Sequence, residues 1–174
     1  MNFDLDHAIG ILQRTPLVLR ALLQDLPSEW VDRSEGEKTW SPYDVIGHLI
    51  HGERTDWIPR ARIILSDGEA RAFEPFDRFA QLEASKGKSL EELLSTFKTL
   101  RTENLRALKD MNLTRVDLNK TGSHPELGRV TMGQLLATWA SHDLDHLVQI
   151  GRTMAVQYRD AVGPWRAFLS VMKQ

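Results

Sequence analysis

Helical periodicity limits what this chain can fold into, because apolar residues recur at three- and four-residue spacing along four long segments and strand-like alternation is scarce. The segments cover about residues 3–26, 41–67, 89–111 and 131–158. An amphipathic helix must bury its apolar stripe, and four such helices in a chain of 174 residues pack most simply against one another. The pattern therefore predicts an all-α fold, a four-helix bundle that forms a single domain over residues 1–174.

Helix-start signals support three of these segments. A Ser or Thr whose side chain can accept a backbone N–H opens each one, and it is followed by proline at the first helical position or by Glu or Gln three residues on. The three signals are Ser41 with Pro42, Ser89 with Glu92, and Thr131 with Gln134. Within the first segment, Pro16 follows Thr15 and predicts a kink or a restart with Thr15 as the cap, and Pro59 predicts a bend in the second.

The connections differ in length and polarity. Residues 26–40 are predicted to link the first two helices, and residues 68–87, which lack a persistent period, form a long connection between the second and third helices that permits a crossover. Residues 112–130 are polar, contain Gly and Pro, and predict a loop. A short final helix is predicted to begin at Pro164.

Composition excludes several classes of function. With 22 basic and 24 acidic residues the net charge is −2, so no broad basic field favours nucleic acid as a partner. The chain has no cysteine, which excludes disulfides, thiolate metal ligands and a thiol nucleophile of its own. No apolar run is long enough for a membrane span, and the acidic N-terminal stretch does not resemble a secretory signal. A cytoplasmic location is expected.

The stretch ASHDLDHLVQI, residues 140–150, raises the question of a metal site. His142 and His146 are four residues apart, so on a helix they project from one face one turn apart and can supply two nitrogen ligands to one divalent ion. Such a pair is more often exposed or engaged in ordinary hydrogen bonds. A third histidine, His48, lies near the middle of the second helix, and facing helices of a bundle commonly build metal sites from inward side chains.

The other histidines have less support as metal ligands. His51 competes with His48, but its neighbours Glu53 and Arg54 are charged, so a solvated or supporting role is the simpler interpretation. His7 is interpreted as a surface residue. His124 could cover the entrance to a site, although a turn residue is the simpler interpretation.

Three carboxylates close to the histidines in the sequence are candidates for orienting a ligand or accepting a proton, but none stands out. Asp44 lies one turn before His48 and could orient its imidazole, whereas Asp145 and Glu53 point away from the ligand face. For all three, a solvated carboxylate on a helix surface is at least as plausible. Gln149, one turn after His146, is better suited to supporting a ligand than to catalysis.

Three tryptophans, Trp40, Trp57 and Trp139, could line a pocket, although a core position is commoner for large aromatic residues in a bundle. Trp139 is the best of these candidates because it shares the histidine face.

The stretch WSPYDVIGHLIHGE together with HPELGRVTMGQLLATWASHDLDHLVQI resembles the DinB/YfiT-like superfamily. The resemblance extends over nearly the whole chain, including the terminal YRDAVGPWRAFL, and its most specific part is HDLDHLVQI with the upstream HPELG. It implies a bundle of four long helices with a divalent metal bound by three histidines, here His48, His142 and His146. The superfamily includes thiol-dependent S-transferases and a thiol-dependent isomerase, and its name implies a stress response for some members.

Three nitrogen ligands would leave the ion an open position, as in catalytic sites, and suit zinc, nickel, cobalt or iron, with zinc and nickel preferred here. The leading hypothesis is a metal-dependent transferase that activates a low-molecular-weight thiol toward an electrophilic small-molecule substrate. A hydrolase that uses activated water is the alternative, as is a non-catalytic metal-binding bundle, for which a homodimer is possible.

Overall fold

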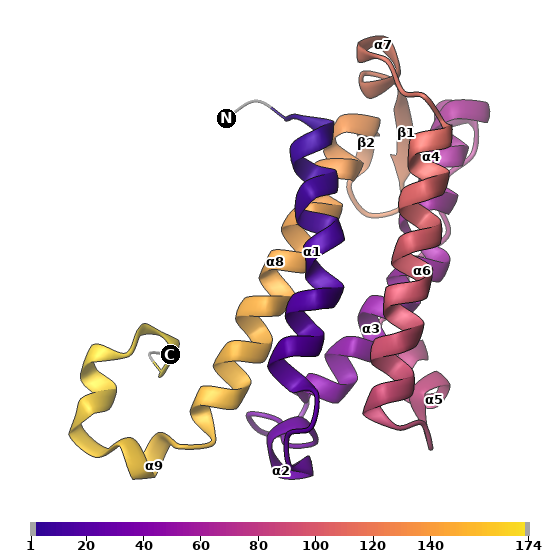
Figure 1. Ribbon diagram of the computed structural model, residues 1–174. Helices are drawn as coiled ribbons and strands as arrows, with labels where there is room; N and C mark the ends of the chain where they lie inside the picture. Colours follow the sequence, from indigo (N-terminus) through magenta and orange to yellow (C-terminus); the bar gives the residue numbers. More distant parts are fainter. Residues whose placement is uncertain (1–2, 173–174) are drawn as a thin grey trace.

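The computed structural model describes residues 3–172. Four helices form the bundle: α1 (Leu5–Leu23), α3 (Pro42–Thr55), α6 (Leu90–Asp110) and α8 (Met132–Val156). Helix α1 packs against both α6 and α8, and α3 closes the arrangement because it packs against the same two helices (Figure 1). The predicted all-α four-helix bundle is confirmed.

All three predicted helix starts are confirmed. The side chains of Ser41, Ser89 and Thr131 each accept a hydrogen bond from the backbone N–H three residues on, and the side chain of that residue accepts one from the cap's own N–H. Such reciprocal caps satisfy N–H groups that have no partner within the helix. Helix α1 begins differently, with Asp4 accepting a hydrogen bond from the N–H of His7.

The predicted restart at Pro16 is wrong, because α1 continues through the proline. The Thr15 hydroxyl donates to the Ile11 carbonyl one turn back, so it does not cap a new helix. Pro16 lacks the N–H that would bond to the Leu12 carbonyl, but Arg101 Nη1 donates to that carbonyl at 2.8 Å. A tertiary hydrogen bond thus takes the place of the missing helical one.

The second segment divides into two helices. Helix α3 ends at Thr55, Asp56 forms the break, and α4 continues over Trp57–Ser66. Pro59 lies in the first turn of α4, where its missing N–H costs little. The predicted bend near Pro59 therefore takes the form of a break three residues earlier.

The connections contain short elements. Residues 26–40 include α2 (Ser28–Val31), and residues 68–87 include the 3₁₀ turn η1 (Gly68–Ala70) and α5 (Ala80–Ser85), in agreement with a long connection. The prediction of a loop over 112–130 is wrong, because this segment contains α7 (Arg115–Leu118), β1 (Thr121–His124) and β2 (Gly128–Thr131).

The two strands are antiparallel, with Thr121 opposite Thr131. Their turn is stabilised by His124 Nδ1, which accepts the N–H groups of Glu126 and Leu127, and it ends at Gly128 with a φ of 69°. The strands are short and carry little apolar alternation, so period alone did not reveal them.

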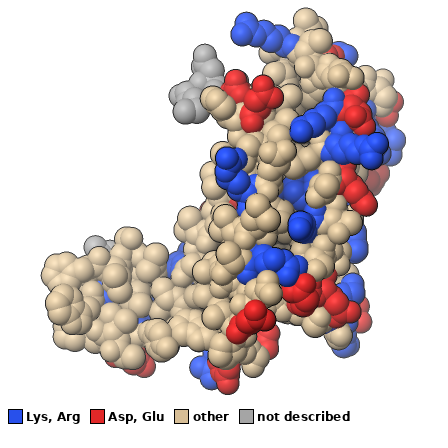
Figure 2. Space-filling view, in the orientation of Figure 1, with Lys and Arg blue, Asp and Glu red and all other residues tan. Residues whose placement is uncertain are grey.

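The C-terminal segment comprises α9 (Arg159–Val162) and two 3₁₀ helices, η2 (Gly163–Phe168) and η3 (Ser170–Met172). The predicted final helix at Pro164 is therefore a 3₁₀ helix. Figure 1 shows this segment projecting from the end of α8, and Figure 2 shows few charged side chains on it, in contrast to the mixed acidic and basic surface of the bundle.

The buried core comprises two apolar clusters. One includes Leu12, Leu136 and Trp139, and the other includes Ile46 and Phe97. Among residues 3–172, no helix combines the length and the apolar character that a membrane crossing requires.

Candidate metal centre

Three histidines from two helices meet inside the bundle. His48 lies on α3, and His142 and His146 lie on α8. The Nε2 atom of His142 is 3.1 Å from Nε2 of His48 and 3.1 Å from Nε2 of His146. One nitrogen from each of the three lies within 4.8 Å of the others. The structure therefore brings together the three side chains that the sequence singled out.

Burial keeps these imidazoles neutral. Removal from water lowers the pKa of His48 and of His142 from 6.5 to about 3, and the neighbouring His146 adds to the shift in both. Burial also lowers the pKa of His146. A neutral imidazole has a free lone pair, which is the form that a metal ion requires.

Gln149 supports the third imidazole, as predicted. Its Oε1 lies 2.7 Å from Nδ1 of His146, so Nδ1 carries the proton and Nε2 presents its lone pair to the cluster. The Nδ1 atoms of His48 and His142 are buried and have no partner among residues 3–172.

The donor set fits a divalent ion. Two nitrogens bound to one tetrahedral zinc at the usual ~2.0–2.1 Å lie roughly 3.3 Å apart. The two separations that involve His142 are both 3.1 Å, close to that value, and the third pair lies within 4.8 Å. Three neutral nitrogens without thiolate suit zinc or nickel.

Aromatic rings surround the cluster. The Trp40 ring centroid lies 4.7 Å from that of His48, and the Trp57 and His142 rings form a T-shaped pair with centroids 5.2 Å apart. Both tryptophans line a cavity of about 500 Å³ that also reaches all three histidines. The preference for Trp139 as a pocket residue is wrong: it is fully buried beneath the cavity, where its ring stacks on Trp57 with centroids 5.7 Å apart.

The candidate carboxylates are mostly engaged elsewhere. Asp44 accepts hydrogen bonds from the backbone N–H and hydroxyl of Ser41, so it caps α3 and does not orient His48. Glu53 is not a solvated side chain: it is fully buried and bonded to Arg101. Asp145 is exposed and lines the cavity.

Asp56 is a site residue that the sequence did not reveal. It lies at the break between α3 and α4, lines the cavity, and forms an ion pair with Arg60 one turn later. Burial raises its pKa from 3.8 to about 6, and Arg60 opposes the rise. This carboxylate can therefore exchange a proton near neutral pH. In the sequence, only the i, i+4 spacing of Asp56 and Arg60 indicated that this carboxylate could form an ion pair.

The remaining histidines lie outside the cluster. His51 packs against the ring of Phe76, and His7 lies on the surface. His124 is a turn residue, as the simpler interpretation held: it stabilises the hairpin turn, and it also lines the cavity.

Comparison with known proteins relates this chain to one family and to several proteins. Residues 11–150 match the family model of the DinB superfamily. A curated protein of Oceanobacillus iheyensis, named "Putative metal-dependent hydrolase OB0782", is 26% identical over 150 residues, which cover 86% of this chain and 85% of that protein. The structure of YfiT from Bacillus subtilis, described as a probable metal-dependent hydrolase with an unusual four-helix bundle topology, has 20% sequence identity and a TM-score of 0.72, covering 90% of this chain and 87% of its own.

The likeness to YfiT confirms the fold class. The resemblance noted from the histidine motifs is confirmed as well, since the family match extends over most of the chain, from residue 11 to residue 150. The protein belongs to the DinB superfamily.

Proposed function

We propose that this protein is a metal-dependent enzyme in which His48, His142 and His146 hold one divalent ion, with zinc and nickel as the leading candidates. The observation that carries the proposal is the convergence of three neutral Nε2 atoms at the wall of a 500 Å³ cavity. A cavity of this size accommodates a small molecule. An ion held there acts as a Lewis acid that lowers the pKa of a bound water or thiol and polarises a substrate oxygen.

The chain's own residues bind and orient the substrate. Trp40 and Trp57 offer aromatic faces beside the histidines, suited to an apolar portion of a small molecule. Gln149 keeps the proton of His146 on Nδ1, away from the site.

The leading reaction is the transfer of a low-molecular-weight thiol to an electrophilic small molecule. The chain has no cysteine, so the sulfur must come from a diffusible thiol. A thiol, whose pKa is about 8.5, loses its proton far more readily than water does. Thiol transfer therefore has less need of a general base, and Asp44 and Glu53 are both held in other contacts and cannot serve as one.

Hydrolysis is the second candidate, and Asp56 favours it. A carboxylate with a pKa of about 6 on the cavity wall can accept a proton from water during attack. The names of the two relatives, which describe metal-dependent hydrolases, also support this reaction.

The first test is the metal content of untagged protein, measured by mass spectrometry, with His142→Ala purified in parallel. About one divalent ion per chain, lost in the variant, is expected. If the natural sequence takes up neither zinc nor nickel on incubation, the proposal is wrong.

The second test separates the reactions. Metal-loaded protein is incubated with a panel of electrophiles and esters, with and without thiol, and products are followed by mass spectrometry. Consumption that requires thiol supports transfer, whereas turnover without thiol that falls in Asp56→Asn supports hydrolysis. Metal binding that raises the melting temperature without turnover of any compound would indicate a non-catalytic bundle.

A further inference from the structure

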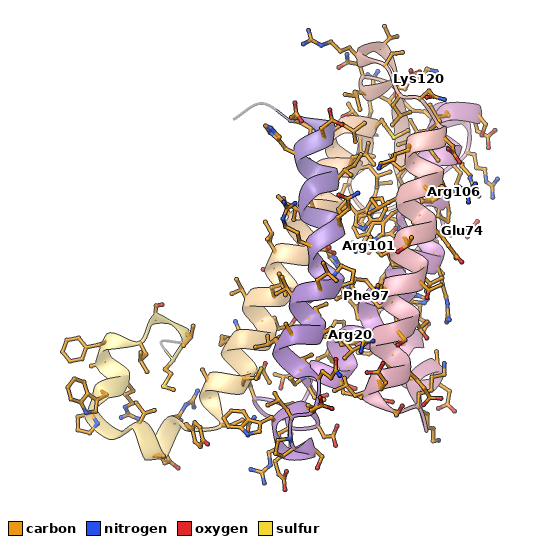
Figure 3. The ribbon with its side chains drawn as sticks, in the orientation of Figure 1. Arg20, Glu74, Phe97, Arg101, Arg106 and Lys120 are labelled. Atoms are coloured by element: carbon orange, nitrogen blue, oxygen red, sulfur yellow. The ribbon has the colours of Figure 1, made fainter. Side chains whose placement is uncertain are left out.

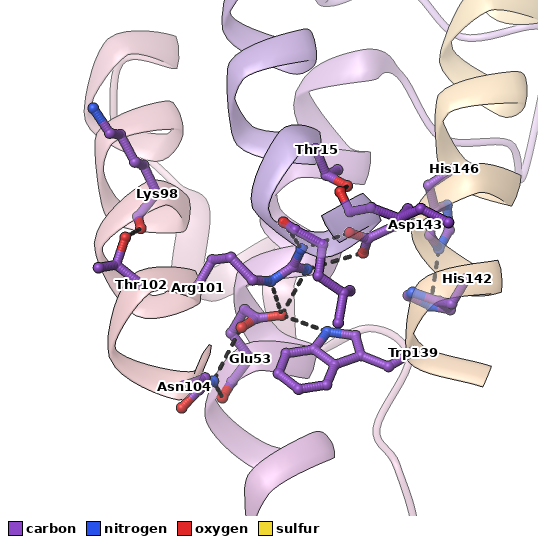
Figure 4. A network of polar contacts seen from close by, with 12 residues as sticks. Thr15, Glu53, Lys98, Arg101, Thr102, Asn104, Trp139, His142, Asp143 and His146 are labelled. Atoms are coloured by element: carbon purple, nitrogen blue, oxygen red, sulfur yellow. Dashed lines mark hydrogen bonds and ion pairs between the residues drawn. The ribbon is translucent and has the colours of Figure 1, made fainter. Parts of the chain in front are cut away.

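A buried arginine beside the histidine cluster uses every donor it has. Arg101, on α6, is 1% exposed and points into the bundle near Phe97 (Figure 3). Its Nε donates to Glu53, Nη2 donates to Glu53 and Asp143, and Nη1 donates to Asp143 and to the Leu12 carbonyl, at distances from 2.5 to 3.1 Å (Figure 4). A guanidinium has five N–H groups, and all five are satisfied here.

The carboxylates of Glu53 and Asp143 also have hydrogen-bond partners for both of their oxygens. Glu53 Oε1 accepts from Arg101 and from Trp139 Nε1, and Glu53 Oε2 accepts from the Asn104 amide. Burial raises the pKa of Glu53 and Arg101 opposes the rise. Because every neighbour of its two oxygens is a donor, we assign the ionised form. Both oxygens of Asp143 face Arg101. The cluster therefore consists of two buried carboxylates on either side of one guanidinium.

This cluster joins all four long helices at the level of the histidines. Leu12 lies on α1, Glu53 on α3, Arg101 on α6 and Asp143 on α8. The free carbonyl of Leu12 exists because Pro16 cannot bond to it. Fixing Glu53 and Asp143 on one planar guanidinium fixes the rotation and the axial position of α3 relative to α8.

The same cluster supports the His142 side chain. Asp143 is its neighbour in the chain, and Trp139, one turn earlier, is bonded to Glu53 and stacks on Trp57. The Trp57 and His142 rings in turn pack in a T-shaped arrangement. Removing one member would leave a buried polar group unpaired and allow the stack to shift.

Stability alone does not explain such a cluster, because buried ion pairs contribute little more than apolar residues of the same volume. Two apolar clusters already bury the apolar faces of the helices and stabilise the bundle. We propose that Arg101 is a positioning residue of the metal centre: through Glu53 and Asp143 it holds α3 and α8 at the separation that three histidine ligands need. This rests on the proposed function.

The test compares Arg101→Lys, which keeps the charge but removes the planar fork, with Leu19→Ala as a matched control. Leu19 is fully buried, lies in the apolar cluster around Phe97 and does not line the cavity, so its truncation destabilises the fold without touching the site. Zinc affinity is measured by competition with a chelator, and the visible absorption of the cobalt-loaded protein reports ligand geometry. Near-ultraviolet circular dichroism of metal-free protein reports the Trp57–Trp139 stack.

The expected result for Arg101→Lys is a zinc affinity lower by about 10- to 100-fold, a changed cobalt spectrum and a weaker tryptophan signal. Leu19→Ala should lower the melting temperature and leave all three readouts unchanged. If Arg101→Lys does not fold, Glu53→Gln, which keeps the shape but replaces one acceptor oxygen with an amide that cannot accept, should also weaken zinc binding.

Wild-type zinc affinity and an unchanged cobalt spectrum in a folded Arg101→Lys or Glu53→Gln protein would overturn the inference and leave the proposed function intact. Equal losses of affinity in Leu19→Ala and Arg101→Lys would also overturn it, because the effect would then be one of general stability. A natural sequence that binds neither zinc nor cobalt would overturn both proposals.

Discussion

Acid should destabilise the metal-free protein through His142. Burial and the neighbouring His146 and His48 lower the pKa of His142 to about 3 in the folded state, whereas an unfolded chain has an ordinary histidine pKa near 6.5. As pH falls below 6.5 the unfolded state takes up a proton that the folded state refuses. The stability contributed by the neutral imidazole is therefore present above pH 6.5 and is lost as the pH falls toward 3.

The size of this effect follows from the two pKa values. Between about pH 7 and about pH 5, protonation of His142 in the unfolded state alone lowers the free energy of unfolding by about 2 kcal/mol. For a chain of this length that corresponds to a shift in melting temperature of roughly 4–8 °C. His48 contributes in the same direction, and Asp56, whose pKa is raised to about 6, contributes in the opposite direction.

The contribution of His142 is isolated by comparing two proteins. Urea unfolding of the natural sequence and of His142→Gln is followed by circular dichroism at several pH values in the presence of a chelator. The variant should gain about 2 kcal/mol relative to the natural sequence as the pH falls from about 7 to about 5. The same substitution at His7, whose side chain is 74% exposed, controls for the loss of any histidine. Parallel stability curves for the natural sequence and His142→Gln would refute the reasoning.

Three further predictions concern the metal and the packing. Zinc at about 100 times its dissociation constant should raise the free energy of unfolding by about 2.7 kcal/mol in a thermal melt, and His146→Ala should abolish this gain. Gly122→Ala should destabilise the fold by roughly 1–3 kcal/mol, because the added Cβ would lie 2.8 Å from two buried side chains, whereas Gly151→Ala, with open space in α8, should stabilise it by up to about 1 kcal/mol in urea unfolding. Trp139→Phe should cost about 1.5–3 kcal/mol in the same assay, because Glu53 loses a donor.

A specific result would contradict each of these three predictions. A zinc-dependent rise that persists in His146→Ala would place the metal elsewhere. Equal stability of the two glycine variants would contradict the packing described at Gly122. If Trp139→Phe unfolds like the natural sequence, the hydrogen bond to Glu53 contributes nothing to stability.

The helices and their beginnings were predictable because their causes are local. Apolar residues repeat at the helical period, and Ser41, Ser89 and Thr131 cap backbone groups only three residues away. The shared face of His142 and His146 follows from their spacing on one helix in the same way. The choice of His48 as their partner depended on a motif resemblance as well as on its position in a second amphipathic helix.

Contacts between helices were beyond the reach of the sequence. Whether Glu53 lies in water or against Arg101 depends on how α3 and α6 are rotated toward each other, and a carboxylate next to Arg54 gives no sign of that rotation. The continuity of α1 through Pro16 likewise depends on a donor from α6 that is distant in the chain. Local periodicity thus determined the helices and one face of the site. Tertiary packing decided which polar groups are buried together, because the free energy of a buried charge is set by partners from other helices.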